Sequence, residues 1–182
     1  MCRSYSPRSV PRFQIVRLLE AARRAPSAGH CQGVRFAVVT DRATREMIAC
    51  AQGELEYREK GFEPWLSVAP VHIVVATSQQ AYRERYSEPD KSTGPDEWDV
   101  PYEVMDAGKA LMCLYLGAQE FGLACGYLGP HAGVDLVSLL GLPAQWRYLG
   151  LVTLGYRKGR GVKTRSQERG WRPFDEVVKW VP

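Results

Sequence analysis

The sequence predicts one domain that contains both helices and strands. At 182 residues the chain can enclose a full hydrophobic core but is short for two domains. Segments with helical periodicity alternate with short apolar segments that are typical of strands. This alternation by itself would suggest a doubly wound α/β fold, but short strands do not show whether they run parallel or antiparallel. The pattern alone therefore leaves the arrangement of the sheet open.

The first predicted helix covers residues 12–24. Ile15, Leu18, Leu19 and Ala22 recur on one of its faces, and prolines stand just before and just after it. The next expected elements are a strand over 34–40, a helix from Asp41 to about Gln52, and a buried strand over 71–77.

A long helix is predicted over residues 101–121, and it is apolar nearly all round. A helix without a polar face must be covered on all sides, by its own domain or by a second subunit. The remaining expected elements are a strand over 124–129, a short helix over 134–140 and a last core strand over 149–155.

Two polar segments, 53–65 and 78–100, are expected to be loops. The second is long for a compact domain, and such loops are usually disordered or functional. Because it carries Tyr82, Tyr86 and Trp98 among its charges, we expect an ordered lid.

The composition is that of a soluble globular protein, with 45% hydrophobic and 24% charged residues. The sequence contains no apolar run of ~18 residues, so no membrane span is predicted. The first residues do not resemble a secretion signal. The five cysteines are widely spaced, which predicts neither a metal site nor disulfides but free thiols in the cytoplasm.

Positive charge gathers near the C-terminal end. Residues 157–172 carry seven cations against Glu168, a net +6, so the rest of the chain sums to −2. The cations are Arg157, Lys158, Arg160, Lys163, Arg165, Arg169 and Arg172. Few aromatic residues accompany them, so nucleic acid is not the expected partner. A solvated loop is one interpretation, and contact with the phosphate of a cofactor is the other.

The segment from Ala25 to Phe36 carries the clearest functional signal. Pro26 and Gly29 end the preceding helix, and Ser27, His30 and Gln32 bring polar groups to the bend. Backbone N–H groups at such a turn suit an anion or the edge of a heteroaromatic ring.

In its arrangement this segment resembles the small-Pro-Ser-x-x-Asn-x-Gln motif of the FMN-dependent nitroreductase family. His30 stands where the family usually has Asn, and Gly33-Val34 where it usually has Pro-Trp. Weaker matches lie before and after this segment, in the same order as in the family. They are at residues 3–5, 69–75, 106–108, 122–129, 140–143, 154–156 and 172–178. The resemblance implies an α+β fold with a mixed, mainly antiparallel sheet flanked by helices, in an intertwined homodimer. Residues 1–182 would form a single domain, in which 156–182 is a C-terminal extension that reaches the partner subunit.

The resemblance also assigns the expected FMN contacts. Arg3 would meet the pyrimidine edge, Ser27 and the backbone after it the ribityl-phosphate of the other subunit's flavin, and the Gly129 N–H the ring N5. Arg169 and Arg172 would hold the phosphate. The cofactor-binding set is Arg3, Ser4, Pro26, Ser27, Ala28, His30, Gln32, Leu128, Gly129, Arg169 and Arg172. The alternatives are solvated arginines and ordinary turns. No catalytic side chain and no metal ligand is assigned.

The three histidines are interpreted separately. His30 is expected to replace the motif's Asn as a hydrogen-bonding group rather than to form a nucleophilic pair with Cys31. His72, inside an apolar strand, is expected in the core, and His131 could lie near the flavin.

The family usually has an arginine pair upstream of the first matched residues, and this sequence begins at Met1. Either the start lies further upstream or FMN is held by fewer cations. One lost charge-assisted contact would weaken binding about ten- to a hundredfold.

The leading functional hypothesis is an FMN-dependent oxidoreductase that uses NADH or NADPH to reduce a nitro compound, quinone or other small organic acceptor. One alternative is an FMN-dependent oxidase or dehydrogenase of a metabolite. The other is a degenerate flavodomain that acts as a non-catalytic binding or scaffold subunit. No Gly-x-Gly-x-x-Gly follows a strand, so the nicotinamide is expected to visit the flavin transiently.

Overall fold

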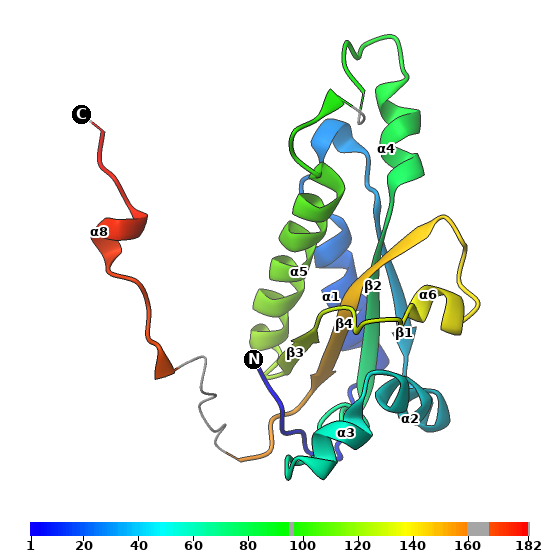
Figure 1. Cartoon of the computed structure of the whole chain (residues 1–182), viewed down its shortest axis with the longest axis vertical. Coiled ribbons are helices and arrows are strands. Elements are labelled where there is room, and N and C mark those ends of the chain that lie inside the picture. Colours follow the sequence, from blue (N-terminus) through cyan, green and yellow to red (C-terminus); the bar gives the residue numbers. More distant parts are fainter. Residues whose placement is uncertain (95–96, 160–167, 182) are drawn as a thin grey trace.

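The computed structural model describes residues 1–94, 97–159 and 168–181. The strands are β1 (Val34–Val39), β2 (Val71–Ser78), β3 (Ala124–Leu128) and β4 (Trp146–Gly155). The helices are α1 (Arg12–Arg23), η1 (Ala28–His30, a 3₁₀ turn), α2 (Arg42–Ala51), α3 (Glu54–Glu59), α4 (Gln79–Tyr86), α5 (Tyr102–Glu120), α6 (Leu136–Leu139) and α8 (Phe174–Val177). Figure 1 shows the sheet standing between two groups of helices.

The sheet has the order β1-β2-β4-β3, and every neighbouring pair is antiparallel. In its register Phe36 pairs with Val75, and Ile73 pairs with Val152. A doubly wound α/β fold needs parallel strands, so that arrangement is excluded for this sheet. The predicted α+β class is confirmed.

The central strand β2 is buried along its whole length and separates two hydrophobic clusters. Val71, Ile73 and Val75 face α1 and α5. Val74 faces the opposite side, where α2, α6 and the N-terminal segment pack. Because successive side chains of a strand point to opposite faces, one apolar strand supplies both cores.

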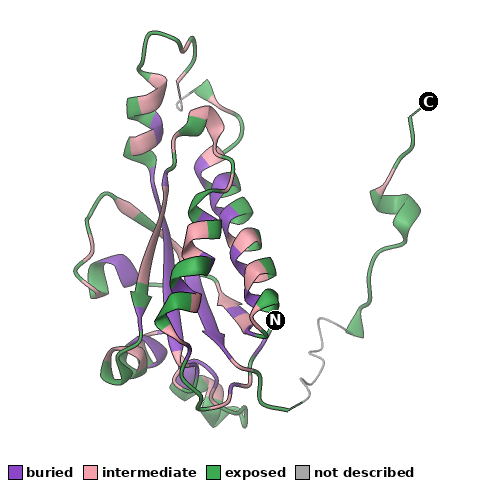
Figure 2. Ribbon diagram, turned by 180° about the vertical axis from the view of Figure 1, so that it is seen from behind, coloured by how far each residue is buried: buried purple, intermediate pink, exposed green. Residues whose placement is uncertain are grey.

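Helix α5 buries one stripe and exposes another. Ala107, Ala110, Leu114 and Ala118 pack inward, against α1 and the sheet. The outer side carries Met105, Met112 and Leu116, whose side chains are 46%, 54% and 61% exposed. The predicted long helix is confirmed, but within the single chain it is not covered on all sides, and Figure 2 shows exposed residues along its outer side.

The prediction that 53–65 and 78–100 are loops is wrong in part, because these segments contain α3 and α4. Neither helix has an amphipathic pattern in a window this short, and tertiary contacts stabilise both. The buried carboxylate of Glu54 accepts backbone hydrogen bonds from Trp65 and Leu66, and Tyr82 of α4 is buried. The Ser78 side chain caps the start of α4.

Beyond β4 the chain leaves the body of the domain. The tail that carries α8 extends away from the sheet in Figure 1. Its large side chains are exposed, with Trp171 at 100% and Trp180 at 87%. The predicted cations Arg160, Lys163 and Arg165 lie outside the described residues. No helix in the described ranges is long and apolar enough to cross a membrane.

Candidate functional site

The turn between α1 and β1, residues 26–33, has an unusual backbone. Gly29, His30 and Gln32 all have positive φ angles, of 55°, 59° and 50°. Two of them are not glycine, and residues with side chains rarely adopt this conformation without support. We refer to residues 26–33 as the Ser27 turn.

The amides of the Ser27 turn are already used inside the protein. The Ser27 carbonyl accepts from the His30 N–H at 2.9 Å, and the Ser27 hydroxyl oxygen accepts from the Gln32 N–H at 3.0 Å. The Ala28 N–H donates to the carboxylate of Asp106 at 2.9 Å. A buried carboxylate beside these amides disfavours a second anion, so the turn fits a neutral part of a ligand better than a phosphate.

Asp106 connects the Ser27 turn to two helices. Its side chain is 1% exposed on α5 and also accepts from the Tyr82 hydroxyl at 2.9 Å and from Lys109 Nζ at 2.8 Å. Burial and the hydrogen bond to Asp106 both raise the pKa of Tyr82. The charge of Asp106 is thus compensated by three donors, as a buried carboxylate requires.

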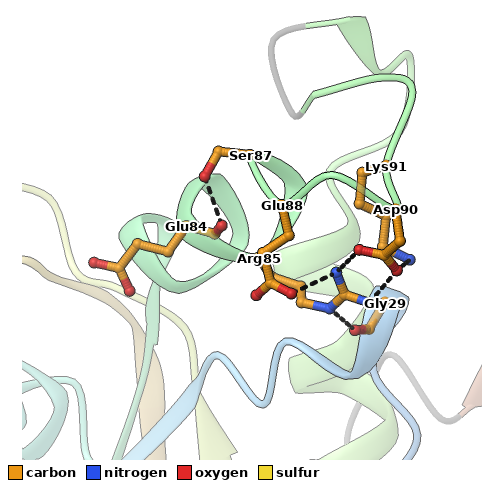
Figure 3. A network of polar contacts seen from close by, with 7 residues as sticks. All are labelled: Gly29, Glu84, Arg85, Ser87, Glu88, Asp90 and Lys91. Carbon is orange, nitrogen blue, oxygen red and sulfur yellow. Dashed lines mark hydrogen bonds and ion pairs between the residues drawn. The ribbon is translucent and has the colours of Figure 1, made fainter.

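Helix α4 closes the Ser27 turn from the other side, as Figure 3 shows. Arg85 donates through Nε to the Gly29 carbonyl at 2.9 Å, and two of its nitrogens form hydrogen bonds to Asp90. The rings of Tyr86 and Tyr82 occupy the space where side chains on Gly29 and Gly33 would stand. Any larger residue at Gly29 or Gly33 would therefore displace a tyrosine.

A hollow of about 190 Å³ lies beside the Ser27 turn. Ser27, Gln32 and Arg35 give it polar groups, and Asp106 lies at its wall. Small alanines from α1 and α5 leave room for it. Its mixture of hydroxyl, amide, guanidinium and apolar groups suits a polyhydroxyl chain or a ring edge.

Arg3 belongs to a second group of residues on the opposite face of the sheet. Its Nη1 donates to the Tyr57 hydroxyl at 3.2 Å, and its guanidinium lies 5.5 Å from the centre of the Trp65 ring. Among the described residues no carboxylate lies within ion-pair distance of Arg3. Ser4 is hydrogen-bonded to Lys158, so both residues of this segment are held in place.

The beginning of β3 is near Arg3, and Leu128 and Gly129 lie at the far end of this strand. The Cys2 N–H donates to the Cys125 carbonyl at 2.8 Å, which seats the N-terminal segment on β3. Leu128 is half-buried and Gly129 is exposed just after the strand. The Gly129 N–H has no hydrogen-bond acceptor in the described part of the chain.

The predicted site residues therefore fall into separate groups within one chain. The Ser27 turn lies where β2 ends, since the Ser78 N–H donates to the Gly33 carbonyl. Arg3 lies where β2 begins, beside α3, because the neighbouring Cys2 pairs with Cys125, whose partner on β4, Leu154, pairs with the first residue of β2, Val71. Arg169 and Arg172 are exposed on the tail, where Arg172 contacts Glu176 at 3.5 Å.

The histidines and Cys31 differ in burial and therefore in the roles open to them. His72 is fully buried, and its Nε2–H donates to the Leu66 carbonyl at 2.8 Å, so the prediction of a core histidine is confirmed. Burial, with the charge of Asp106, raises the pKa of the Cys31 thiol to about 11, which makes a nucleophilic thiolate there unfavourable. His30 and His131 are both exposed.

Sequence reasoning missed most of the residues that support these groups. Tyr57, Trp65 and Glu54 come from a segment expected to be a loop, and Arg85 from a segment expected to be a lid. Asp106 was noted only as part of a matched motif. In the described residues no group of His, Cys, Asp or Glu is placed to hold a metal ion.

Comparison with known proteins defines the class. The model of the nitroreductase family matches residues 1–156, and the chain belongs to this family. An Archaeoglobus fulgidus protein provisionally named an NADH dehydrogenase/NAD(P)H nitroreductase is 29% identical over 160 residues, 86% of this chain and 79% of that protein. The FMN reductase [NAD(P)H] of Bacillus subtilis is 28% identical over 167 residues, 88% of this chain and 64% of that protein.

A solved structure shares the fold. It is a provisionally named nitroreductase of Desulfovibrio desulfuricans in complex with FMN, with a TM-score of 0.72 and 22% identity. The match covers 100% of this chain and 91% of that one.

Proposed function

We propose that the protein is an FMN-dependent oxidoreductase that takes a hydride from NADH or NADPH and passes it to a nitro compound, quinone or other small organic acceptor. The family match and the names of two relatives support the class and the electron donor. The Desulfovibrio desulfuricans structure with bound FMN supports the cofactor.

The observation that carries the proposal is the state of Arg3. Its positive charge is held by two aromatic side chains and is not neutralised by a carboxylate of the described residues. A reduced flavin ring carries negative charge at its pyrimidine edge, and an uncompensated guanidinium stabilises that charge. The Gly129 N–H, just after the end of β3, offers a further donor for the ring.

FMN fits these residues in chemical type, and when bound it supplies the hydride-transfer chemistry. Arg3, Ser4, Leu128 and Gly129 would bind one part of it. Ser27 and Gln32 offer neutral polar groups beside a hollow that Arg35 also lines, with Pro26, Ala28 and His30 shaping the turn. We assign Ser27 to the ring or ribityl chain rather than the phosphate, because Asp106 lies behind the Ala28 amide.

The two groups can complete one site if they come from two copies of the chain. We therefore propose a homodimer in which the Ser27 turn of one copy faces the Arg3 group of the other. The exposed apolar side of α5 and the exposed aromatic residues of the tail offer the surfaces that such a dimer buries. Arg169 and Arg172 would reach the phosphate from the tail. All five cysteines are free, and our proposed location remains the cytoplasm.

Anaerobic titration of the purified protein with FMN, then with NADH or NADPH, tests the function. Binding with bleaching of the flavin absorbance by a nicotinamide supports the reductase. Binding without bleaching, but with reduction by a metabolite and reoxidation by oxygen, would favour the oxidase alternative. Failure to bind FMN at tens of micromolar would favour the scaffold alternative.

A further inference from the structure

The residues around Arg3 restrict the orientation of its side chain, and we call them the Arg3 holder. Three elements far apart in sequence meet there: the N-terminal segment, the α3 segment and β3. Arg3 is exposed, yet its guanidinium is oriented by a hydrogen bond from Nη1 to the Tyr57 hydroxyl and by the Trp65 ring. An exposed arginine without partners would sample many rotamers, so these contacts restrict it.

The backbone beneath Arg3 is fixed. The Cys2 N–H is bonded to β3, and the Ser6 N–H donates to the Tyr156 carbonyl at 2.8 Å. The Tyr5 hydroxyl is 2.7 Å from the Thr153 hydroxyl inside the core. The start of the Arg3 side chain therefore has little freedom.

The two aromatic partners are themselves held. One carboxylate oxygen of Glu54, 6% exposed, accepts from the backbone N–H groups of Trp65, Leu66 and Ser67 at 2.8, 2.6 and 3.2 Å. The Trp65 ring packs over Gly126, where a Cβ would stand 2.8 Å from it. The Tyr57 ring stacks on Phe62 with ring centres 4.4 Å apart.

The chemical character of the holder matters as much as its rigidity. A carboxylate partner would orient Arg3 but would also cancel its charge toward a ligand. A phenol oxygen and an indole face orient a guanidinium while leaving its net charge intact. This choice of partners suits a cation whose task is to stabilise an anion that forms only during turnover.

We propose that Tyr57 and Trp65 are positioning residues that hold the Arg3 guanidinium for the flavin's pyrimidine edge and thereby raise the reduction potential of the bound flavin. This inference rests on the proposed function, since it requires FMN at Arg3. On this inference, residues of the α3 segment influence the reduction potential of the cofactor.

The test is a double-mutant cycle on the full chain, with the midpoint potential of bound FMN as the readout. That potential, relative to free FMN, reports the ratio of the dissociation constants of oxidised and reduced FMN. Arg3→Gln should weaken binding of reduced FMN relative to oxidised FMN about tenfold, and Tyr57→Phe about threefold in the same direction. Trp65→Phe, which keeps an aromatic face, should lie between Tyr57→Phe and the wild type.

The decisive variant is Arg3→Gln with Tyr57→Phe. If Tyr57 acts through Arg3, the double variant should match Arg3→Gln alone. Tyr156→Phe, which also loses one 3.2 Å side-chain hydrogen bond, to Gln14, is the matched control and should leave the potential unchanged.

Three outcomes would overturn the inference while FMN still binds. They are an unchanged potential in Tyr57→Phe, an unchanged potential in Arg3→Gln, or a Tyr57→Phe effect that persists without Arg3. A wild-type protein that binds no FMN would instead overturn the proposed function.

Discussion

The Arg3 group and the Ser27 turn lie at opposite ends of β2 and treat charge in opposite ways. At Arg3 a cation is oriented by uncharged aromatic groups, and its charge remains available. At the Ser27 turn an anion, Asp106, is buried and accepts hydrogen bonds from three donors. Its charge is therefore compensated within the protein and is not available to a ligand. The first arrangement suits binding of developing negative charge, and the second suits rigid support of a neutral contact.

The difference indicates a division of labour within one cofactor site. A charged residue that responds to a change in the ligand's charge must not be neutralised by other groups of its own protein. A buried charged residue that only fixes the backbone must be neutralised in this way. If both belong to one site, each chain carries half of two sites. Changing residues of either half should therefore have different consequences for FMN binding and for stability.

Mixing two defective variants should restore FMN sites. Arg3→Glu reverses the charge of one half-site, and Ser27→Trp fills the hollow of the other. Each alone should lose most FMN binding, but co-expressed copies should recover about a quarter of the sites. This follows because half of randomly formed dimers are mixed, and each mixed dimer has one intact site, so the isolated mixed dimer should hold about one FMN per dimer, half the wild-type content. FMN content of the doubly tagged dimer measures it, and no recovery would mean that the two groups do not share a site.

Removing the buried carboxylate at the Ser27 turn should be costly for stability. Asp106→Ala leaves the Ala28 N–H, the Tyr82 hydroxyl and Lys109 without their acceptor, so the free energy of unfolding should fall by about 3 kcal/mol. Denaturant unfolding at fixed protein concentration measures this, and faster hydrogen exchange at Ala28 would locate the effect. Glu120→Ala, exposed on the same helix, should change stability by less than about 0.5 kcal/mol. Equal losses in the two variants would argue against a special role for Asp106.

Acid should weaken the fold through His72, on the Arg3 side of the sheet. Burial lowers its pKa from 6.5 to about 4. Between these values the unfolded chain binds one more proton than the folded chain at this position, so stability falls as the pH falls, by about 3 kcal/mol in total. Because His72 supports the Leu66 carbonyl, next to Trp65, the Arg3 group should loosen before the Ser27 turn.

Replacement of the histidines separates this effect from general acid lability. His72→Gln keeps a donor for Leu66 but does not titrate, so its stability should depend less on pH. The exposed His131→Gln should retain the wild-type dependence. If the two variants show the same pH profile, the loss belongs to other groups.

The sequence allowed the sheet, its core strands and the Ser27 turn to be located, because apolar periodicity and Pro/Gly breaks are local signals. It did not allow the two charge arrangements to be predicted. Tyr57 lies 54 residues from Arg3, and Asp106 lies 78 residues from Ala28, so these contacts exist only once the sheet has formed. Helices α3 and α4 were missed for the same reason, since a buried glutamate and a buried tyrosine stabilise them rather than a repeating apolar face.

The smallest effect is expected from the tail. Its arginines differ from both Arg3 and Asp106, because they are exposed and are not oriented by the body of the domain. Arg169 and Arg172 are solvent-exposed, so they should add long-range attraction to the FMN phosphate rather than orientation. Changing both to Gln should raise the dissociation constant for FMN about threefold at low salt, with little change in reduction potential. The loss should shrink as salt is added, because exposed charges are screened within about 10 Å at 0.1 M salt. Arg42→Gln, an equally exposed arginine on α2, should leave FMN affinity unchanged at every salt concentration. A salt-independent loss would indicate that the tail arginines are buried against the phosphate in the dimer, and no loss would remove the tail from the site.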